Sequence, residues 1–533
     1  MNAFGGTGTL VRLAIRRDRV LMPVWIIVFA ALAASSAAAT VGVYPTVQSR
    51  VAAAEAANAT PSIVALYGPV FDPTSLGGIA LLKMNAFGAL LVAILMIVFM
   101  VRHTRAEEEQ GRLELMSAGV VGRFAPLSAA LVVALGSSVL LGAATAAGLI
   151  GAGLPTGGSL TFGLMWATAG VTFSAVAAVA AQLTESARAA TGLSLVVLGL
   201  SYLFRAMGDT AGDGGPAWLS WVSPIGWAQQ IRPFGGDRVW VAAVSVVFVL
   251  VATASAFALV QRRDIGAGLV RPRPGRAQAS PLLDNPLGLA WRLQRATLLA
   301  WSAAYLVLGS VFGNLAVNVG NFADSPQARE LITRLGGVQG LTDAFLSTEF
   351  GMVGVITAAY GIQAALRLRS EEISLRAEPI LATAVSRPRW AASHLLVALL
   401  GTAWLMVLAG AAAGLSYGAQ AGDVAGKLGQ LMSAALVQLP AAWVLTGVAM
   451  LLFGVAPRWV VGAWVALVAF LVVGEFGSLL GLSQAVMNVS PFTHVPRMPG
   501  ADFALAPVLW LLAVAAGLIA LGIAAFRRRD VPA

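Results

Sequence analysis

Long apolar runs separated by short polar segments dominate this sequence. About twelve runs of roughly 20 mostly apolar residues occur, each long enough to cross the hydrocarbon core of a bilayer as a helix. They lack the alternation of polar and apolar residues expected of membrane barrel strands. The pattern predicts an all-α integral membrane protein with about twelve transmembrane helices. We place the spans near residues 20–42, 79–101, 125–152, 158–182, 188–205, 238–260, 293–317, 346–366, 390–416, 428–455, 457–480 and 503–526.

A charged segment between the second and third spans occurs twice. Residues 105–123 return, shifted by 264 positions and without a gap, as residues 369–387. The register continues into the next apolar run, where residues 131 and 133–135 match 395 and 397–399. Such a match predicts a tandem duplication with one charged segment in each half. The main matched pairs are Arg105 and Arg369, Glu107 and Glu371, Glu108 and Glu372, Arg112 and Arg376, Glu114 and Glu378, and Arg123 and Arg387.

The duplication predicts two six-helix halves in the same orientation. We place the first half at residues 1–260, a cytosolic linker rich in Pro, Gly and Arg at 261–290, and the second half at 291–533. A basic lead-in precedes each half, with Arg292-Leu293 set against Arg12-Leu13. The first lead-in is either an interfacial helix facing anionic lipid or an ordinary positive-inside anchor.

Composition and charge agree with a membrane location. The chain is 58% hydrophobic and 11% charged, whereas soluble domains carry about a quarter charged residues. With a cytosolic N-terminus, 25 of the 34 Lys and Arg fall on inner segments, so both termini are predicted to be cytosolic. This topology accounts for the net charge of +10 without a nucleic-acid partner. The preference for Arg over Lys favours a GC-rich bacterial genome, and hence a multi-pass protein of the bacterial cytoplasmic membrane.

The sequence offers little chemistry of its own. It has no cysteine, no phosphate-binding G-x-x-x-x-G-K-[ST] loop, no metal-ligand spacing among its three His, and no nucleophile motif with a His partner. We therefore predict no catalytic residue, no metal site and no bound cofactor. Nearly all acids lie outside the spans, with Glu475 and Glu349 as the exceptions, whereas ion-coupled carriers need an ionisable group at membrane depth. Arg205 and Glu475, at the outer ends of the fifth and eleventh spans, are a predicted ion pair.

A second repeat lies outside, before the last span of each half. Val222-Ser-Pro-Ile225 matches Val489-Ser-Pro-Phe492 at a shift of 267 positions. These loops either form interfacial turns with tryptophan anchors or dip into the membrane as part of an outer gate. The gate candidates are Trp221, Ser223, Pro224, Ser490 and Pro491.

The repeated charged segment is the main functional candidate. If it is helical, Glu108 and Arg112 form a favourable i,i+4 pair, as do Glu372 and Arg376. Residues 113, 116 and 120 would form an apolar stripe suited to a groove in another protein. One interpretation is a solvated loop stiffened by ion pairs, and the other is a docking element.

With these features the chain resembles the ABC-2 type permeases, which have a type V exporter-like fold. The duplicated form resembles the actinobacterial exporters of polyketide antibiotics, the tetronasin-type transporters. The resemblance covers essentially the whole chain and implies a separate ATP-binding-cassette ATPase, as a dimer that carries ATP and Mg²⁺. It also implies that the loop between the second and third spans couples to that ATPase. The coupling residues would be Glu107, Glu108, Arg112 and Glu114, and Glu371, Glu372, Arg376 and Glu378.

The function expected from this resemblance is export of a lipophilic small molecule, such as an antibiotic or a lipid-like compound. One alternative is a twelve-span, ion-coupled secondary carrier, although its usual G-x-x-x-D-R-x-G-R-R loop is not found between spans two and three. Another is a membrane assembly factor that transports nothing. The second charged segment departs from the first at Leu375 and Pro379, which replace Gly111 and Leu115.

Overall fold

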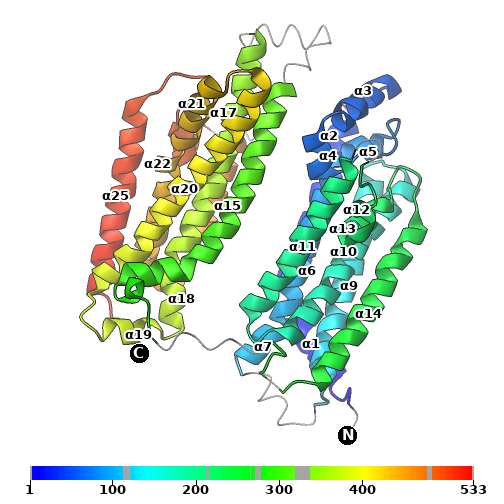
Figure 1. Cartoon of the computed structure of the whole chain (residues 1–533), viewed down its shortest axis with the longest axis horizontal. Coiled ribbons are helices and arrows are strands. Elements are labelled where there is room, and N and C mark those ends of the chain that lie inside the picture. The colour runs from blue at the N-terminus through cyan, green and yellow to red at the C-terminus, as the bar shows by residue number, and fades with distance from the viewer. Residues whose placement is uncertain are drawn as a thin grey trace. The chain divides into compact units, whose positions relative to one another are not determined.

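Helices form all the regular secondary structure in the part of the chain that the structure describes. The computed structural model describes residues 3–41, 43–111, 121–211, 215–264, 266–270, 278–318, 337–476 and 483–530. Eleven of its helices are long and apolar enough to cross a membrane. The prediction of an all-α, multi-pass membrane protein is therefore confirmed. The chain divides into two units, residues 1–275 and 276–533, which are described separately below (Figure 1).

The first unit surrounds a nearly buried central helix, α10. Phe162, Trp166 and Phe173 of α10 are buried against the neighbouring helices, and the Trp166 indole donates to the Met84 carbonyl at 3.1 Å. Helices α1 and α7 lie at one end of this unit, and α3, α4 and α5 lie at the other (Figure 1). The helices are α1 (Thr7–Arg17), α2 (Leu21–Val41), α3 (Val47–Asn58), α4 (Pro61–Tyr67), α5 (Leu76–Ala80), α6 (Ala86–Arg102), α7 (Arg105–Glu109), α9 (Ala125–Gly151), α10 (Thr156–Leu183), α11 (Ala187–Asp209), α12 (Leu219–Val222), α13 (Pro224–Gln230) and α14 (Ala242–Gln261).

In the second unit the long helices α15 and α20 pack closely against each other. A Cβ atom added at Gly309 or Gly313 would lie within 2.6 Å of the Ala409 or Ala413 carbonyl oxygen, so only glycine permits this contact. This is the small-xxx-small packing of membrane helices. The helices are α15 (Pro286–Asn318), α17 (Gly337–Ala365), α18 (Arg367–Ile373), α19 (Ala377–Leu381), α20 (Arg387–Ala421), α21 (Val424–Leu436), α22 (Leu439–Val455), α23 (Gly462–Phe476), α24 (Gln484–Met487) and α25 (Leu505–Arg528), with the 3-10 turn η6 (Pro491–His494) before α25.

One predicted span is shorter than the others in the described residues. The span placed at 457–480 contains α23, whose 15 residues extend about 22 Å, whereas the hydrocarbon core is about 30 Å thick. Residues 477–482 lie outside the described part of the chain. The span placed at 428–455 consists of α21 and α22, and Pro440, which has no N–H to donate, lies in the first turn of α22.

The two lead-ins match in a register different from the predicted one. A shift of 276 positions, rather than the 280 that aligns Arg292 with Arg12, brings the buried Ala290 onto the buried Ala14. It also aligns the buried polar residues Asp18 and Gln294. The helix breaks after Arg17 in the first half, because the Pro23 ring would clash with the carbonyl four residues earlier in a continuous helix. Leu299 stands at the matching position, and α15 continues unbroken.

The boundary between the halves contains ordered structure on both sides. Helix α15 begins at Pro286, inside the stretch predicted to be linker. On the other side, the chain after α14 returns to α10, where the Val270 amide donates to the Leu183 carbonyl at 3.0 Å. The predicted domain limits at 260 and 291 stay a prediction.

Candidate coupling site

Helix α7 is held at the end of the first unit by the buried residue Arg105. This guanidinium has no exposed surface, and it donates from Nε to the Ala181 carbonyl at 3.0 Å and from Nη2 to the Ala267 carbonyl at 2.9 Å. Nη2 also donates to the Thr184 carbonyl. Three carbonyls from the end of α10 and the chain after α14 therefore surround one cation.

Glu108 lies between Arg105 and a second arginine, Arg263. Its carboxylate accepts from Arg105 Nη1 at 2.5 Å, and both of its oxygens accept from Arg263, at 2.6 and 2.8 Å. Arg263 also donates to the Gln182 side chain at 2.7 Å. Because bidentate arginine–carboxylate pairs are strong and directional, Glu108 fixes α7 to the chain that follows the last span of its half.

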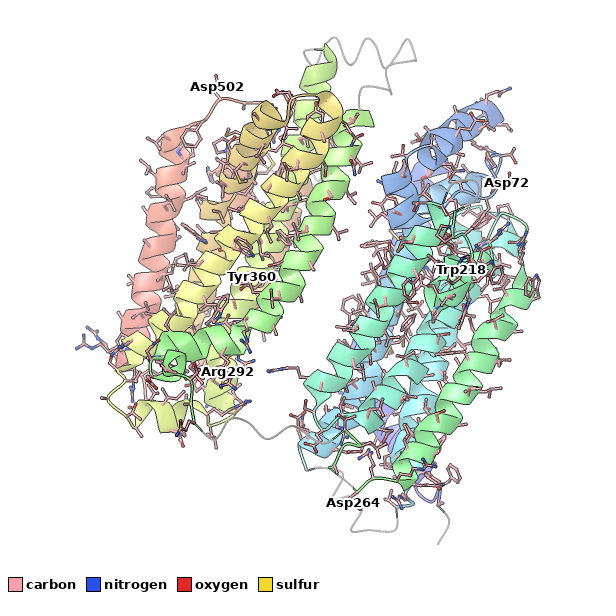
Figure 2. All side chains as sticks on the ribbon, viewed as in Figure 1. Asp72, Trp218, Asp264, Arg292, Tyr360 and Asp502 are labelled. Atoms are coloured by element: carbon pink, nitrogen blue, oxygen red, sulfur yellow. The ribbon has the colours of Figure 1, made fainter. Side chains whose placement is uncertain are left out.

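Arg123 closes the same group from the start of the third span. Its Nη2 donates to the carbonyls of Val260 and Arg263, at 2.8 and 3.0 Å. We call Arg105, Glu108, Arg123 and Arg263 the first charge clamp. Figure 2 shows Asp264, the next residue along the chain, at the end of this unit that carries α7.

The second half builds the same group from Arg369, Glu372, Arg387 and Arg529, the second charge clamp. Glu372 accepts from Arg369 Nη1 at 2.9 Å and from Arg529 Nη2 at 2.6 Å. Arg387 donates to the Arg529 carbonyl at 2.5 Å. Burial lowers the pKa of the Arg529 guanidinium, and the negative charge of Glu372 opposes this shift. Arg529 follows α25 as Arg263 follows α14, so the two clamps match residue by residue.

The backbone after the two short helices also matches. Gly111 has φ of 69° and Leu375 has φ of 56°, so both adopt the left-handed conformation. Their amides donate to the carbonyls of Glu108 and Glu372, at 2.9 and 3.0 Å. The replacement of glycine by leucine between the copies therefore leaves the shape of the turn unchanged.

The clamps change the interpretation of the predicted coupling residues. Glu107 forms an ion pair with Arg17 of α1, and Glu371 forms one with Arg367, whose Nη2 lies 2.6 Å from a Glu371 carboxylate oxygen. With Glu108 and Glu372, they are acids held inside their own unit, with 12% of the side chain exposed at most. Arg112, Glu114 and the apolar stripe at 113, 116 and 120 lie outside the described residues.

The prediction that Glu372 pairs with Arg376 is wrong. Helix α18 ends at Ile373, and the left-handed Leu375 turns the chain before Arg376 can reach the position that an i,i+4 pair requires. Arg376 lies 3.7 Å from Glu371 instead, and 57% of its side chain is exposed. Glu378, in α19, is also exposed.

The Ser-Pro repeat forms a buried contact in both halves. Ser223 donates to the Ser201 carbonyl of α11 at 2.6 Å, and Ser490 donates to the Phe470 carbonyl of α23 at 3.0 Å. Each proline begins the helical turn that follows its serine. Trp221 stacks on the Trp240 ring, with ring centroids 6.1 Å apart. The serines therefore fix the outer turn to a neighbouring span, whereas Trp221 lies partly exposed; a gating role stays a prediction.

Arg205 has partners within its own unit. Its buried guanidinium lies 3.4 Å from Asp209, donates to the Val64 and Ala65 carbonyls of α4 at 3.2 and 2.5 Å, and covers the Tyr202 ring at 4.3 Å. The side chain of Glu475 is outside the described residues, so the pair between Arg205 and Glu475 stays a prediction.

The sequence alone does not single out two residues of the clamps. Arg263 lies in the predicted linker, and Arg529 lies in the basic C-terminal segment. The available signal was position: each is an arginine just after the last span of its half, and the two are 266 residues apart. No group of three acidic or histidine side chains suited to a metal ion occurs in the described parts of the chain.

Together, the span-length helices and the matched clamps define a duplicated, multi-pass helical membrane protein. The chain belongs to the family described as multidrug efflux system permease Rv1217c, C-terminal domain, whose model matches residues 8–263 and 283–527, one stretch in each half. It is 46% identical over 532 residues to the multidrug efflux system permease protein Rv1217c of Mycobacterium tuberculosis, a similarity that covers 99% of this chain and 96% of that protein.

Proposed function

We propose that this protein is the membrane-spanning permease subunit of an ATP-driven efflux system. It moves a lipophilic small molecule out of the cell, with ATP and Mg²⁺ bound by a separate ATP-binding-cassette ATPase that docks as a dimer. The observation that carries the proposal is the end-to-end similarity to a multidrug efflux permease. The charged segments, one in each half, supply two places at which such a dimer can act.

The proposal divides the coupling residues into two roles. The buried acids Glu108 and Glu372 hold each short helix against the end of the last span of its half. The exposed Arg376 and Glu378 are available to contact the ATPase in the second half. A force on the segment is then passed through the clamp to the helix ends that the clamp joins, in keeping with the rigid-body movements of transporter halves.

A charge reversal confined to exposed residues tests this proposal. We expect Arg376→Glu combined with Glu378→Lys to leave the clamp and membrane insertion intact, because neither side chain is buried. The variant is expressed with the ATP-binding-cassette ATPase encoded nearest to this gene, and extrusion of a panel of lipophilic dyes is measured. Two reversed charges at a desolvated contact cost on the order of 3 kcal/mol, so efflux and co-purification of the ATPase should fall about a hundredfold.

Arg458→Glu is the matched control, because Arg458 is an exposed cation of the same unit outside both clamps. It should leave efflux unchanged. Dye efflux that persists without any ATPase and collapses with a protonophore would contradict the proposal and favour an ion-coupled carrier. Purified protein that moves no dye, with its ATPase and ATP supplied, would favour an assembly factor.

A further inference from the structure

Each half contains an apolar groove beside its third span, α9 or α20. In the first half the groove has a volume of about 430 Å³ and lies between α9 and the α1–α2 lead-in. In the second half it has a volume of about 590 Å³ and lies between α20 and the start of α15. Both volumes fall in the range of about 300–1,000 Å³ that is typical of small-molecule sites.

The two grooves are copies of one another. Five positions of α9 line the first, and the shift of 264 residues converts them into the five positions of α20 that line the second. On the opposite wall, Val11, Ile15 and Met22 correspond at the 276-residue shift to Leu287, Trp291 and Leu298. The paired positions are 132 and 396, 133 and 397, 136 and 400, 137 and 401, and 140 and 404. A hollow that occurs twice in the same register is a feature of the fold rather than a local packing gap.

An exposed arginine occupies the equivalent chain position in each half, close to the residues that line the groove. Arg19 lines the first groove, and Arg295 is its equivalent, four residues after Trp291 on α15. Arg16 and Arg292 repeat the pattern one turn earlier, and Figure 2 shows Arg292 near the charged end of α15. None of the four has an acidic partner within 4.0 Å among the residues that the structure describes.

The position of these arginines in the sequence predicts that they lie at headgroup depth. Arg19 and Arg295 are the last charged residues before the first apolar span of each half, on the side that carries most of the basic residues. An arginine at this depth extends its guanidinium toward the headgroups, while the apolar groove beside it faces the acyl chains. Unpaired cations at the cytosolic surface attract anionic lipid, at about 1 kcal/mol for each side chain.

From this geometry we propose that each half holds one anionic phospholipid of the cytosolic leaflet. One acyl chain occupies the groove along α9 or α20, and the phosphate binds Arg19 in the first half or Arg295 in the second. The proposal concerns a lipid that stays bound, and it does not rest on transport. Transported molecules are a different occupant, which the experiment distinguishes.

Photolabelling tests the site with the full-length protein. The protein is reconstituted in phosphatidylcholine vesicles that contain a trace of phosphatidylglycerol with a diazirine in one acyl chain. A parallel sample carries the same chain on phosphatidylcholine. Mass spectrometry of peptides should locate the label at 132–140 and 396–404, about fivefold more strongly with phosphatidylglycerol, because one arginine contributes about 1 kcal/mol.

Variants separate the headgroup contact from the groove. Arg19→Gln should abolish the preference for phosphatidylglycerol in the first groove only, and Arg295→Gln in the second only. Gly136→Phe should remove labelling of 132–140 with either lipid, because a Cβ at Gly136 meets no atom within 4 Å and the ring enters the groove. Arg188→Gln and Arg458→Gln, at exposed cations outside both grooves, should change nothing.

Three results would overturn the proposal. Equal labelling by the two lipids would mean that the grooves meet only bulk lipid. Label found outside the two peptides would remove the site. Loss of label when a lipophilic dye is added in excess would assign the grooves to transported molecules instead.

Discussion

The two halves form the same charge clamp, but its residues are buried to different extents and make different numbers of hydrogen bonds. In the first half the central arginine, Arg105, is fully buried, and Arg263 binds Glu108 through two nitrogens. In the second half 21% of the Arg369 side chain is exposed, and Arg529 binds Glu372 through one nitrogen. The duplicated chain thus retains the charges and their connections, whereas the solvent exposure of the matched residues has diverged.

The second arginines of the two clamps, Arg263 and Arg529, also have different neighbours. Arg263 donates to the Gln182 side chain, whereas Arg529 lies over the rings of Phe453 and Phe526, 5.1 and 5.3 Å from their centroids. A polar neighbour in one half is thus replaced by cation–π contacts in the other. One connection, from a short helix to the end of the last span, is therefore compatible with two different surroundings.

Removal of the clamp acid should have the largest effect and should separate the two halves most clearly. Glu108→Ala leaves Arg105 and Arg263 buried without a counter-charge, so we expect the free energy of unfolding to fall by about 3–5 kcal/mol. Glu372→Ala should cost about 1–3 kcal/mol, because its two arginine partners make fewer hydrogen bonds to it and are more exposed. Denaturant unfolding of the full-length protein in detergent micelles measures both values.

Glu378→Ala is the control for this pair, because Glu378 is exposed and lies outside the second clamp. Its effect should stay within about 0.5 kcal/mol. Equal losses for Glu108→Ala and Glu372→Ala would show that the difference in burial has no energetic consequence.

The Ser-Pro contacts should respond by a smaller amount. Ser223 donates to the Ser201 carbonyl and accepts from the Gly226 amide, so Ser223→Ala should lower the free energy of unfolding by about 1–2 kcal/mol. Ser490→Ala, with a single bond to Phe470, should cost about 1 kcal/mol. The same unfolding measurement applies, and Ser483→Ala, at an exposed position before α24, serves as the reference. A larger loss at Ser490 than at Ser223 would contradict this ranking.

Substitutions in the two left-handed turns, at Gly111 and Leu375, should have the smallest effect. Leu375 has a left-handed backbone, which costs a residue with a side chain roughly 1–2 kcal/mol relative to glycine. We expect Leu375→Gly to raise the free energy of unfolding by about 1 kcal/mol, after the greater freedom of glycine in the unfolded chain is subtracted. Gly111→Leu should lower it by a similar amount. Changes of the same sign at the two positions would show that the turns are not equivalent.

The apolar pattern predicted the helices well because membrane helices are specified by length and composition. The duplication was also visible, since residues 105–123 and 369–387 match without a gap. The predicted register of the lead-ins differs by four residues from the register in the structure. The dipeptide Arg-Leu occurs in both segments and favours the 280-residue shift over the 276-residue shift. The buried pairs Ala14 with Ala290 and Asp18 with Gln294 become visible only once burial is known.

The clamps could not be predicted from local spacing. Glu108 and Arg263 are 155 residues apart, and Glu372 and Arg529 are 157 apart. A helical reading instead favoured the arginine four residues after each acid. The partner of each acid depends on where the last span of its half ends in the folded protein. No pattern within the charged segment specifies that position.

This separation along the chain also sets an order of events during synthesis. Glu108 leaves the ribosome long before Arg263, and Glu372 long before Arg529. Each of these arginines follows the last membrane helix of its half, α14 or α25. The acid of each half therefore cannot pair with its second arginine until all the membrane segments of that half have been synthesised. Formation of the clamp is thus coupled to completed insertion, and a prematurely truncated half retains an acid that lacks this partner.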